Sequence, residues 1–293
     1  MTRVAILGAG AGGLSATVEL TKAGFECALW NRGRSAINEI IKAGKIRYEG
    51  LLGQGEIKPS LTTTDLKIAL KNADVVLVVL PTIAHSSVAK DLCEFGWSGP
   101  IILNPGHTGG ALEFNAIFKR FQKPVPPLVE FSTLTYVARK LDTDYVNITG
   151  KAKSVRAAAL PGGDSAIKMA QKLYPNINLV SDVLYSSLSN VNLVLHPPGA
   201  ILGASWVEAT GGKFTFYRDG LTEGVSKIMD QLDRERVDVA LKFGHEVPSL
   251  VEEMALIGTV ESSDARKSLR QAISSGKANA LIMAPNNLQH RYY

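Results

Sequence analysis

The sequence predicts an α/β domain built on a doubly wound, mostly parallel sheet, followed by an all-α domain. Two observations carry this prediction. Short apolar runs alternate with helical patterns over residues 1–180, whereas residues 181–293 show helical spacing with few strand signals. The length of 293 residues also fits two domains of ordinary size. We therefore expect the domain boundary near residue 180.

The first domain begins with an uncharged apolar run, residues 4–7, that meets a glycine-rich turn before a helical pattern starts. In the pattern Gly8-x-Gly10-x-x-Gly13, Gly8 allows the sharp turn and Gly10 removes the Cβ that would block a pyrophosphate. Gly13 lets the helix pack close to the strand, and the helix N-terminus directs free N–H groups at the phosphates. This context favours a dinucleotide-binding Rossmann fold over an ordinary glycine-rich turn. The expected binding residues are Gly8, Gly10, Ala11, Gly12 and Gly13.

The second strand is expected at residues 27–30, and the segment after it distinguishes NAD from NADP. That segment contains Asn31, Arg32 and Arg34, where NAD-binding folds usually carry an acidic residue. A carboxylate there would repel a 2′-phosphate, whereas an amide and two guanidinium groups would bind and neutralise it. The sequence therefore predicts NADP as the cofactor. The alternative is that both arginines face solvent and NAD binds through Asn31 alone.

The remaining elements of the first domain follow from apolar runs and helical spacing. Strands are expected at 46–49, 74–80, 100–103, 128–131, 145–148 and 155–160, and helices at 36–43, 65–72 and 162–174. The run 75–80 contains only valine and leucine, which is typical of a strand buried on both faces of a parallel sheet.

Two strand ends supply further candidates for the site. Pro81 follows the 74–80 strand, near the expected position of the second half of a dinucleotide. His85 lies just beyond, and we expect a helix-start histidine with a local partner rather than a cofactor contact. Asn104 and Thr108 follow the 100–103 strand in a segment rich in glycine, and we expect them to contact the nicotinamide or the substrate. The alternative is an ordinary turn in which Thr108 caps the next helix.

Helices of the second domain are expected at 182–195, 219–243, 248–257 and 264–275, with a cleft for a small-molecule substrate between the domains. Asn192 and His196 share one helix face because they are four residues apart. Pro197 and Pro198 are expected to end that helix, which places His196 at a C-terminus where the dipole favours protonated imidazole. Such a histidine suits acid–base work in a redox step on a C=O or C=N bond. The alternative is a structural histidine at a helix end.

Composition narrows the classes of function. The chain is 45% hydrophobic and 20% charged, with a net charge of +5 but no basic block, so a nucleic-acid partner is not expected. A membrane partner is not expected either, because no apolar stretch is long enough to cross a bilayer. The first strand begins at about Arg3, which leaves no room for a signal peptide, and Cys27 and Cys93 form no motif. We expect a reduced, cytoplasmic protein without a metal site.

Four motifs together resemble those of the opine dehydrogenase family, which includes octopine, nopaline and N-(1-carboxyethyl)-norvaline dehydrogenases. The motifs are the glycine turn 8–13, the segment 104–114 (NPGHTGGALEF), Asn190-Val191-Asn192 with His196-Pro197, and Arg291-Tyr292-Tyr293. The first occurs in many folds, whereas the second and third are fairly specific. The likeness runs along the whole chain and implies a Rossmann domain followed by an all-helical domain.

The resemblance also implies a reaction: an amino acid condenses with a 2-oxo acid, and a nicotinamide cofactor reduces the imine. It implies that His196 is catalytic and that Arg291 holds a substrate carboxylate, with Asn192 also at the substrate. Asn31 replaces the acidic residue of NAD-preferring relatives, which agrees with NADP. Family members continue past the Arg-Tyr-Tyr region to an aspartate that pairs with the histidine. The sequence is therefore expected to be a fragment or a short homologue with altered chemistry.

The sequence thus predicts an NAD(P)H-dependent opine dehydrogenase whose partners are an amino acid and a 2-oxo acid. A homodimer through the helical domain would fit this prediction. Two alternatives stay open. One is a 2-oxo or 2-hydroxyacid reductase of the ketopantoate type, which needs no amine, and the other is a non-catalytic dinucleotide-binding protein.

Overall fold

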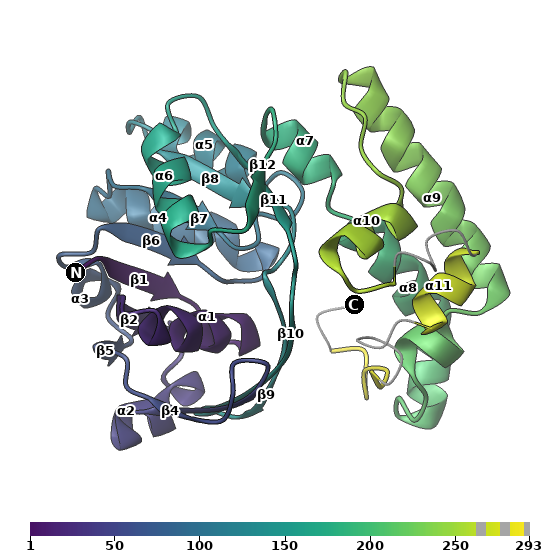
Figure 1. Cartoon of the computed structure of the whole chain (residues 1–293), viewed down its shortest axis with the longest axis horizontal. Coiled ribbons are helices and arrows are strands. Elements are labelled where there is room, and N and C mark those ends of the chain that lie inside the picture. The colour runs from purple at the N-terminus through teal and green to yellow at the C-terminus, as the bar shows by residue number, and fades with distance from the viewer. Residues whose placement is uncertain (262–267, 276–281, 290–293) are drawn as a thin grey trace. The chain divides into compact units, whose positions relative to one another are not determined.

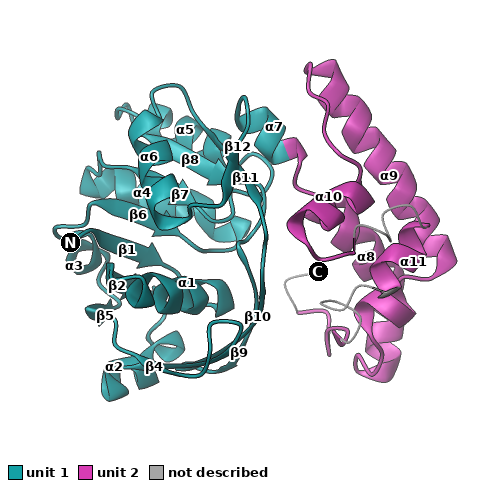
Figure 2. Cartoon of the chain, viewed as in Figure 1, with its two compact units in different colours: residues 1–187 teal, residues 188–293 magenta. Residues whose placement is uncertain are grey.

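The computed structural model describes residues 1–261, 268–275 and 282–289. The chain divides into two compact units, residues 1–187 and 188–293 (Figure 2). Arg291 lies outside the described residues. Within the part of the chain that the structure describes, no helix is both long enough and apolar enough to cross a membrane.

Unit 1 is built on an eight-stranded sheet in the order β12-β11-β8-β7-β6-β1-β2-β5 (Figure 1). Neighbouring strands are parallel except β8 and β11, which pair antiparallel. The strands are β1 (Arg3–Leu7), β2 (Glu26–Trp30), β5 (Leu61–Thr63), β6 (Val75–Val78), β7 (Ile101–Leu103), β8 (Leu128–Phe131), β11 (Val155–Ala159) and β12 (Ile177–Leu179). The predicted doubly wound, mostly parallel sheet is confirmed. Because parallel strands share one carboxyl edge, the loops after β1, β2, β6 and β7 meet there.

A second sheet of four strands, in the order β4-β3-β10-β9, covers the first helix. Its strands are β3 (Ile46–Gly50), β4 (Gly55–Ile57), β9 (Tyr136–Asp142) and β10 (Tyr145–Lys151). Helix α1 (Ala11–Lys22) contacts β1 and β2 on one side and β9 and β10 on the other. This position explains why α1 is buried almost all round, from Gly12 to Val18. The sequence predicted strands near β3 and β10 but not the sheet that joins them.

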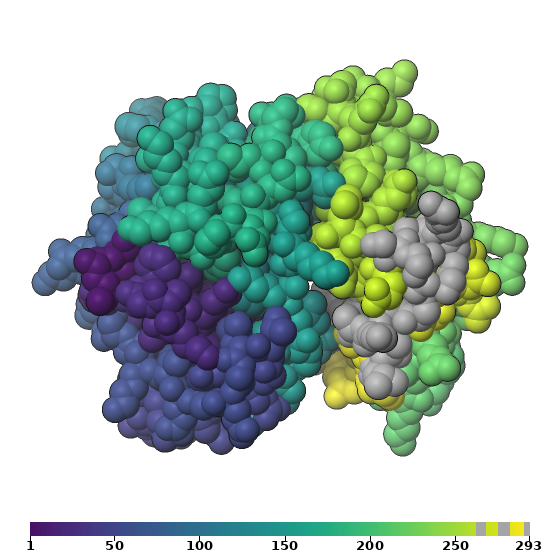
Figure 3. All heavy atoms as spheres, in the orientation of Figure 1, coloured from purple at the N-terminus to yellow at the C-terminus, as the bar shows by residue number. Residues whose placement is uncertain are grey.

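Further helices follow α1 along the chain up to residue 188, and the three predicted at 36–43, 65–72 and 162–174 are present in shortened form. The helices are α2 (Asn38–Ala43), α3 (Leu66–Leu70), α4 (His85–Phe95), α5 (Gly110–Arg120), α6 (Asp164–Leu173) and α7 (Val183–Leu188), with 3₁₀ turns at Arg34–Ala36 and Thr82–Ala84. In Figure 3 the purple N-terminal segment lies at the surface beside the teal segment that contains α6, where Lys172 Nζ donates to Thr2 Oγ1 at 2.6 Å.

The regular elements in the described part of unit 2 are helices, apart from one isolated bridge between Thr215 and Met283. It contains α8 (Asn192–Thr210), a π-helical turn (Phe216–Gly220), α9 (Glu223–Lys242), α10 (Leu250–Ile257) and α11 (Leu269–Ser275). A buried ion pair lies within α9, where Arg236 donates to Asp233 at 2.9 Å, and Asp233 also accepts the Leu250 N–H at 2.6 Å, which links α9 to the start of α10. The all-α character predicted for the second half is confirmed.

The single helix expected over residues 182–195 is wrong, because the structure has two helices there, α7 and α8. Asn190 explains the break. Its Oδ1 accepts the backbone N–H of Asn192 at 3.2 Å, which forms an Asx turn and offers the backbone an alternative to continuous helix.

Candidate nucleotide site and catalytic histidine

The glycine turn after β1 has the geometry that a phosphate-binding loop requires. Gly8 has φ +118°, and a Cβ there would lie 2.3 Å from the Val79 carbonyl oxygen. A Cβ on Gly13 would lie 1.8 Å from the Gly8 carbonyl oxygen, so α1 can approach the strand only with glycine here. By contrast, a Cβ on Gly10 would meet no protein atom within 4 Å. The turn is therefore packed tightly on its protein side and open at Gly10, where α1 presents its first N–H groups.

Asn31 connects the segment after β2 to this turn. Its Oδ1 accepts the Ala9 N–H at 3.1 Å, and its Nδ2 donates to the Gly33 carbonyl at 2.9 Å. Arg32 and Arg34 are exposed on the same segment. The structure thus places two guanidinium-bearing residues on the segment that follows β2, beside a glycine turn fixed by Asn31.

Lys140 is a cation in this region that the sequence did not identify. It lies on β9, and its Nζ donates to the Ala9 carbonyl at 2.9 Å and to the Ala36 carbonyl at 2.8 Å. Burial lowers the pKa of Lys140, and the nearby carboxylates of Asp142 and Asp144 partly offset this shift. No local pattern could have indicated it, because Lys140 is 131 positions from Ala9 in the sequence.

The segment after β6 agrees with the expectation of a local partner for His85. Pro81 is exposed and precedes the 3₁₀ turn Thr82–Ala84. His85 begins α4 and is fully buried, with Nε2 3.2 Å from the Leu80 carbonyl. Since a carbonyl only accepts, Nε2 carries the proton. Burial lowers the pKa of His85, so the ring is neutral at physiological pH.

The two candidates after β7 have contacts within the chain. Asn104 is fully buried, and its Oδ1 accepts from both the backbone N–H and the hydroxyl of Thr135, each at 3.1 Å. The Thr108 hydroxyl donates to the Ser187 carbonyl at 3.1 Å. Thr108 therefore does not cap α5, whose N-cap is Gly109 with φ +82°.

Glu130 is a second residue that the sequence analysis missed. It is fully buried within β8, and its carboxylate accepts the Ala111 N–H at 2.7 Å and the hydroxyls of Ser186 and Ser187 at 2.6 and 2.8 Å. Burial raises the pKa of this carboxyl, although the three donors oppose the rise. A charged residue inside an apolar strand was the available signal, because such a group is buried only with partners. It ties α5 and α7 to the carboxyl edge of the sheet.

His196 lies in the first part of α8, so the prediction that Pro197 and Pro198 end the helix after it is wrong. The helix continues to Thr210, and the dipole argument for a protonated imidazole at a helix C-terminus does not apply. His196 Nε2 lies 2.8 Å from the Tyr217 hydroxyl, which the π-helical turn supplies.

Asn192 begins α8, one turn before His196, and its Nδ2 donates to Asn190 Oδ1 at 3.0 Å. The predicted pairing of Asn192 and His196 on one helix is thus present. Arg291, the other predicted substrate residue, lies outside the described residues.

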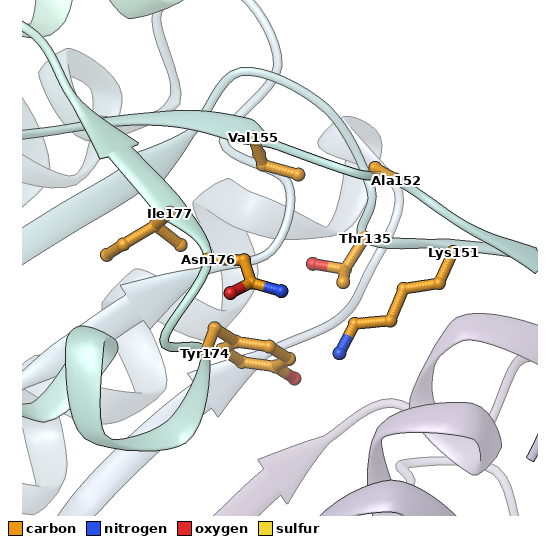
Figure 4. Close-up of a pocket in the computed structure, with 7 residues that line it drawn as sticks. All are labelled: Thr135, Lys151, Ala152, Val155, Tyr174, Asn176 and Ile177. Carbon is orange, nitrogen blue, oxygen red and sulfur yellow. The ribbon is translucent and has the colours of Figure 1, made fainter. Parts of the chain in front are cut away.

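A small cavity in unit 1 is not large enough for a substrate (Figure 4). Thr135, Lys151, Tyr174 and Asn176 point toward it, but its volume is about 10 Å³, which accommodates about one water molecule. Among the described residues, no group of three or more His, Cys, Asp or Glu side chains could hold a metal ion.

A glycine turn with the geometry of a phosphate-binding loop on a Rossmann sheet, followed by a helical unit with a hydrogen-bonded histidine, is typical of NAD(P)-dependent oxidoreductases. Comparison with known proteins specifies the family. Residues 179–293 match the alpha-helical domain of NAD/NADP octopine/nopaline dehydrogenases, and residues 3–104 match the N-terminus of NAD-dependent glycerol-3-phosphate dehydrogenases. The chain is 33% identical to an opine dehydrogenase of Arthrobacter sp. (strain 1C), over 99% of this chain and 80% of that protein. The chain belongs to the opine dehydrogenase family.

Solved structures agree on the fold. An octopine dehydrogenase in complex with NADH and agmatine has a TM-score of 0.75 at 19% identity, covering 100% of this chain and 80% of that one. A yersinopine dehydrogenase with NADP⁺ bound has a TM-score of 0.75 at 11% identity, covering 97% and 78% of the two chains. The two matching family models describe NAD- and NADP-dependent dehydrogenases, so the cofactor class of the chain is NAD(P).

Proposed function

We propose that this protein catalyses the reductive condensation of an amino acid with a 2-oxo acid, using NADPH. The amine nitrogen forms a C=N bond to the oxo carbon with loss of water, and reduction adds a hydride to that carbon and a proton to the nitrogen. The nicotinamide, when bound, supplies the hydride. The observation that carries the proposal is the His196–Tyr217 pair, 2.8 Å apart, in the unit whose sequence matches the octopine dehydrogenase helical domain.

His196 is the proposed acid–base residue. An imidazole can deliver a proton to a developing amine or remove one from it near neutral pH. The hydrogen bond between Nε2 and the Tyr217 hydroxyl orients the ring, and an imidazole can carry a proton at either ring nitrogen. In the family this orientation is expected from a carboxylate, and in the described part of this chain Tyr217 contributes a hydrogen bond at one nitrogen. Asn192 and Arg291 are the proposed substrate-binding residues, with Arg291 for a carboxylate.

The proposed cofactor site joins the carboxyl edge of the main sheet to the start of α1. Its residues are Gly8, Gly10, Ala11, Gly12, Gly13, Asn31, Arg32, Arg34, Pro81, Asn104 and Thr108. The open space at Gly10 fits a pyrophosphate, and the exposed Arg32 and Arg34 support NADP over NAD. Asn104 and Thr108 are proposed to contribute less to cofactor binding, because their side-chain oxygens are already hydrogen-bonded to Thr135 and to the Ser187 carbonyl.

The test is oxidation of NADPH, with NADH in parallel, in the presence of pooled 2-oxo acids with and without pooled amino acids. Turnover that requires both pools is the expected result. Turnover with 2-oxo acids alone would show a ketone reductase and overturn the proposal. Binding of NADPH without turnover under any condition would show a dinucleotide-binding protein and overturn it as well.

We further propose a cytoplasmic location and a homodimer through the helical unit. Cys27 and Cys93 are both free and buried, which suits a reducing compartment. On α8, Ile201 is 70% exposed and Leu202 is 51% exposed, so a partner surface there would cover apolar area. Sedimentation equilibrium of the wild type and of Ile201→Glu tests the dimer: a monomeric wild type would refute it.

A further inference from the structure

Lys140 reaches from the second sheet to the two backbone segments that border the proposed nucleotide site. Its ammonium bridges the Ala9 carbonyl of the glycine turn and the Ala36 carbonyl, which ends the 3₁₀ turn Arg34–Ala36. Asn31 holds the N–H of the same Ala9. The adenosine half of a dinucleotide lies between a glycine turn and the segment after the second strand. The Lys140 charge is therefore fixed at the border of that half.

The surroundings of this ammonium favour an anion as a further partner. Within the described part of the chain, Lys140 forms no ion pair, and the bound carbonyls use two of its three N–H groups. Burial disfavours the charged form of Lys140, and the neighbouring carboxylates of Asp142 and Asp144 offset this effect only in part. Half-burying a cation between two carbonyls costs more hydration than burying a neutral donor there, and an anion at the remaining N–H group would offset part of that cost.

We infer that Lys140 is the third cation of a binding site for the cofactor's 2′-phosphate, together with Arg32 and Arg34. This inference rests on the proposed use of NADPH. A phosphate monoester carries about −1.5 to −2 charges near pH 7 and three acceptor oxygens, so it can engage several cations. Arg32 and Arg34 are exposed and must be ordered on binding, whereas Lys140 is already positioned by two hydrogen bonds. Lys140 thus acts as a specificity-determining residue for NADP over NAD.

The test compares two probes that differ only in the phosphate at issue: adenosine 2′,5′-bisphosphate and adenosine 5′-monophosphate. Their affinities are measured by isothermal titration calorimetry on the full chain and on Lys140→Gln. Glutamine removes the charge but keeps an amide that can donate to both carbonyls. A charge-assisted hydrogen bond contributes about 1.5–3 kcal/mol, so the bisphosphate should bind about 10- to 100-fold more weakly to the variant. Binding of the monophosphate should change less than about threefold.

Two further variants make the outcome specific. Lys140→Arg keeps the charge and should retain most of the preference for the bisphosphate. Lys151→Met removes a lysine from β10, the neighbouring strand, whose ammonium pairs with Glu19, and should leave the ratio of the two affinities unchanged. Melting temperatures of all variants report whether each remains folded.

The possible failures are distinguishable. If the wild type binds both probes equally, the proposed NADPH preference is wrong and the inference falls with it. If the wild type prefers the bisphosphate but Lys140→Gln lowers the affinity for both probes equally, or for neither, the NADPH preference stands and the role of Lys140 is refuted. In that case Lys140 only fastens the glycine turn to β9.

Discussion

Gly10 and Gly13 lie three residues apart in one motif, yet the structure predicts very different effects of alanine on stability. Gly10 has φ −74° and ψ −176°, which any residue adopts, and its added Cβ would meet no protein atom within 4 Å. Gly10→Ala should therefore change the free energy of unfolding by less than about 1 kcal/mol, because alanine restricts the unfolded chain but is a poorer N-cap than glycine. Gly13→Ala would place a Cβ 1.8 Å from the Gly8 carbonyl oxygen. Separating α1 from β1 to relieve that overlap should cost at least about 1–3 kcal/mol.

The effect on the cofactor should be strong in both variants, but for different reasons. In Gly10→Ala the methyl group occupies space that the proposed pyrophosphate needs, while the fold stays intact. Loss of one charge-assisted N–H contact is worth about 1.5–3 kcal/mol, so NADPH should bind about 10- to 100-fold more weakly. In Gly13→Ala binding falls because the turn itself is displaced.

Urea denaturation and titration of NADPH fluorescence measure the two quantities separately. A stable Gly10→Ala variant with weakened NADPH binding supports the placement of the pyrophosphate. Unchanged NADPH affinity in that variant would refute this placement. A Gly13→Ala variant as stable as the wild type would refute the close contact between α1 and the turn.

Three further outcomes are expected. Burial raises the pKa of the Glu130 carboxyl in the folded state above its value in the unfolded chain. The protonated carboxyl therefore contributes its full stabilisation below the unfolded-state pKa, and this stabilisation is lost as pH rises through the folded-state pKa. Urea denaturation between pH 4 and 8 should show the wild type losing stability relative to Glu130→Gln as pH rises, and a constant difference would contradict the burial argument. Tyr217→Phe removes the hydrogen bond to His196, which is worth about 1–1.5 kcal/mol, so kcat should fall about fivefold to tenfold with little change in KM. The pH profile of kcat should also change. An unchanged profile would exclude the His196–Tyr217 pair from proton transfer. Asn31→Asp should shift the ratio of kcat/KM values from NADPH toward NADH, since a carboxylate repels the 2′-phosphate; an unchanged ratio would count against Asn31 at that site.

The parts of the site that the sequence predicted depend on local rules. The glycine turn is specified by spacing within six residues, and the apolar runs of the main sheet are buried on both faces, as in β6. Lys140 and Glu130 escaped prediction because their roles depend on distant partners. Lys140 binds Ala9, which lies 131 positions earlier, and Glu130 binds Ser186, which lies 56 positions later. The second sheet was not predicted for the same reason, because β10 pairs with β3, which lies earlier in the sequence by about half the length of unit 1.

The wrong prediction at Pro197 and Pro198 shows how tertiary packing overrides a helix-breaking signal. Each proline removes a backbone hydrogen bond, and local rules therefore end the helix at His196. The structure continues α8 because the next turn is buried: a Cβ on Gly199 would lie 2.8 Å from Leu221 Cδ2 and 3.0 Å from Phe216 Cζ. The turn that packs on Gly199 is the same π-helical turn that carries Tyr217 to within 2.8 Å of His196. The contact that keeps the helix intact thus also supplies the hydrogen-bond partner of the proposed catalytic histidine.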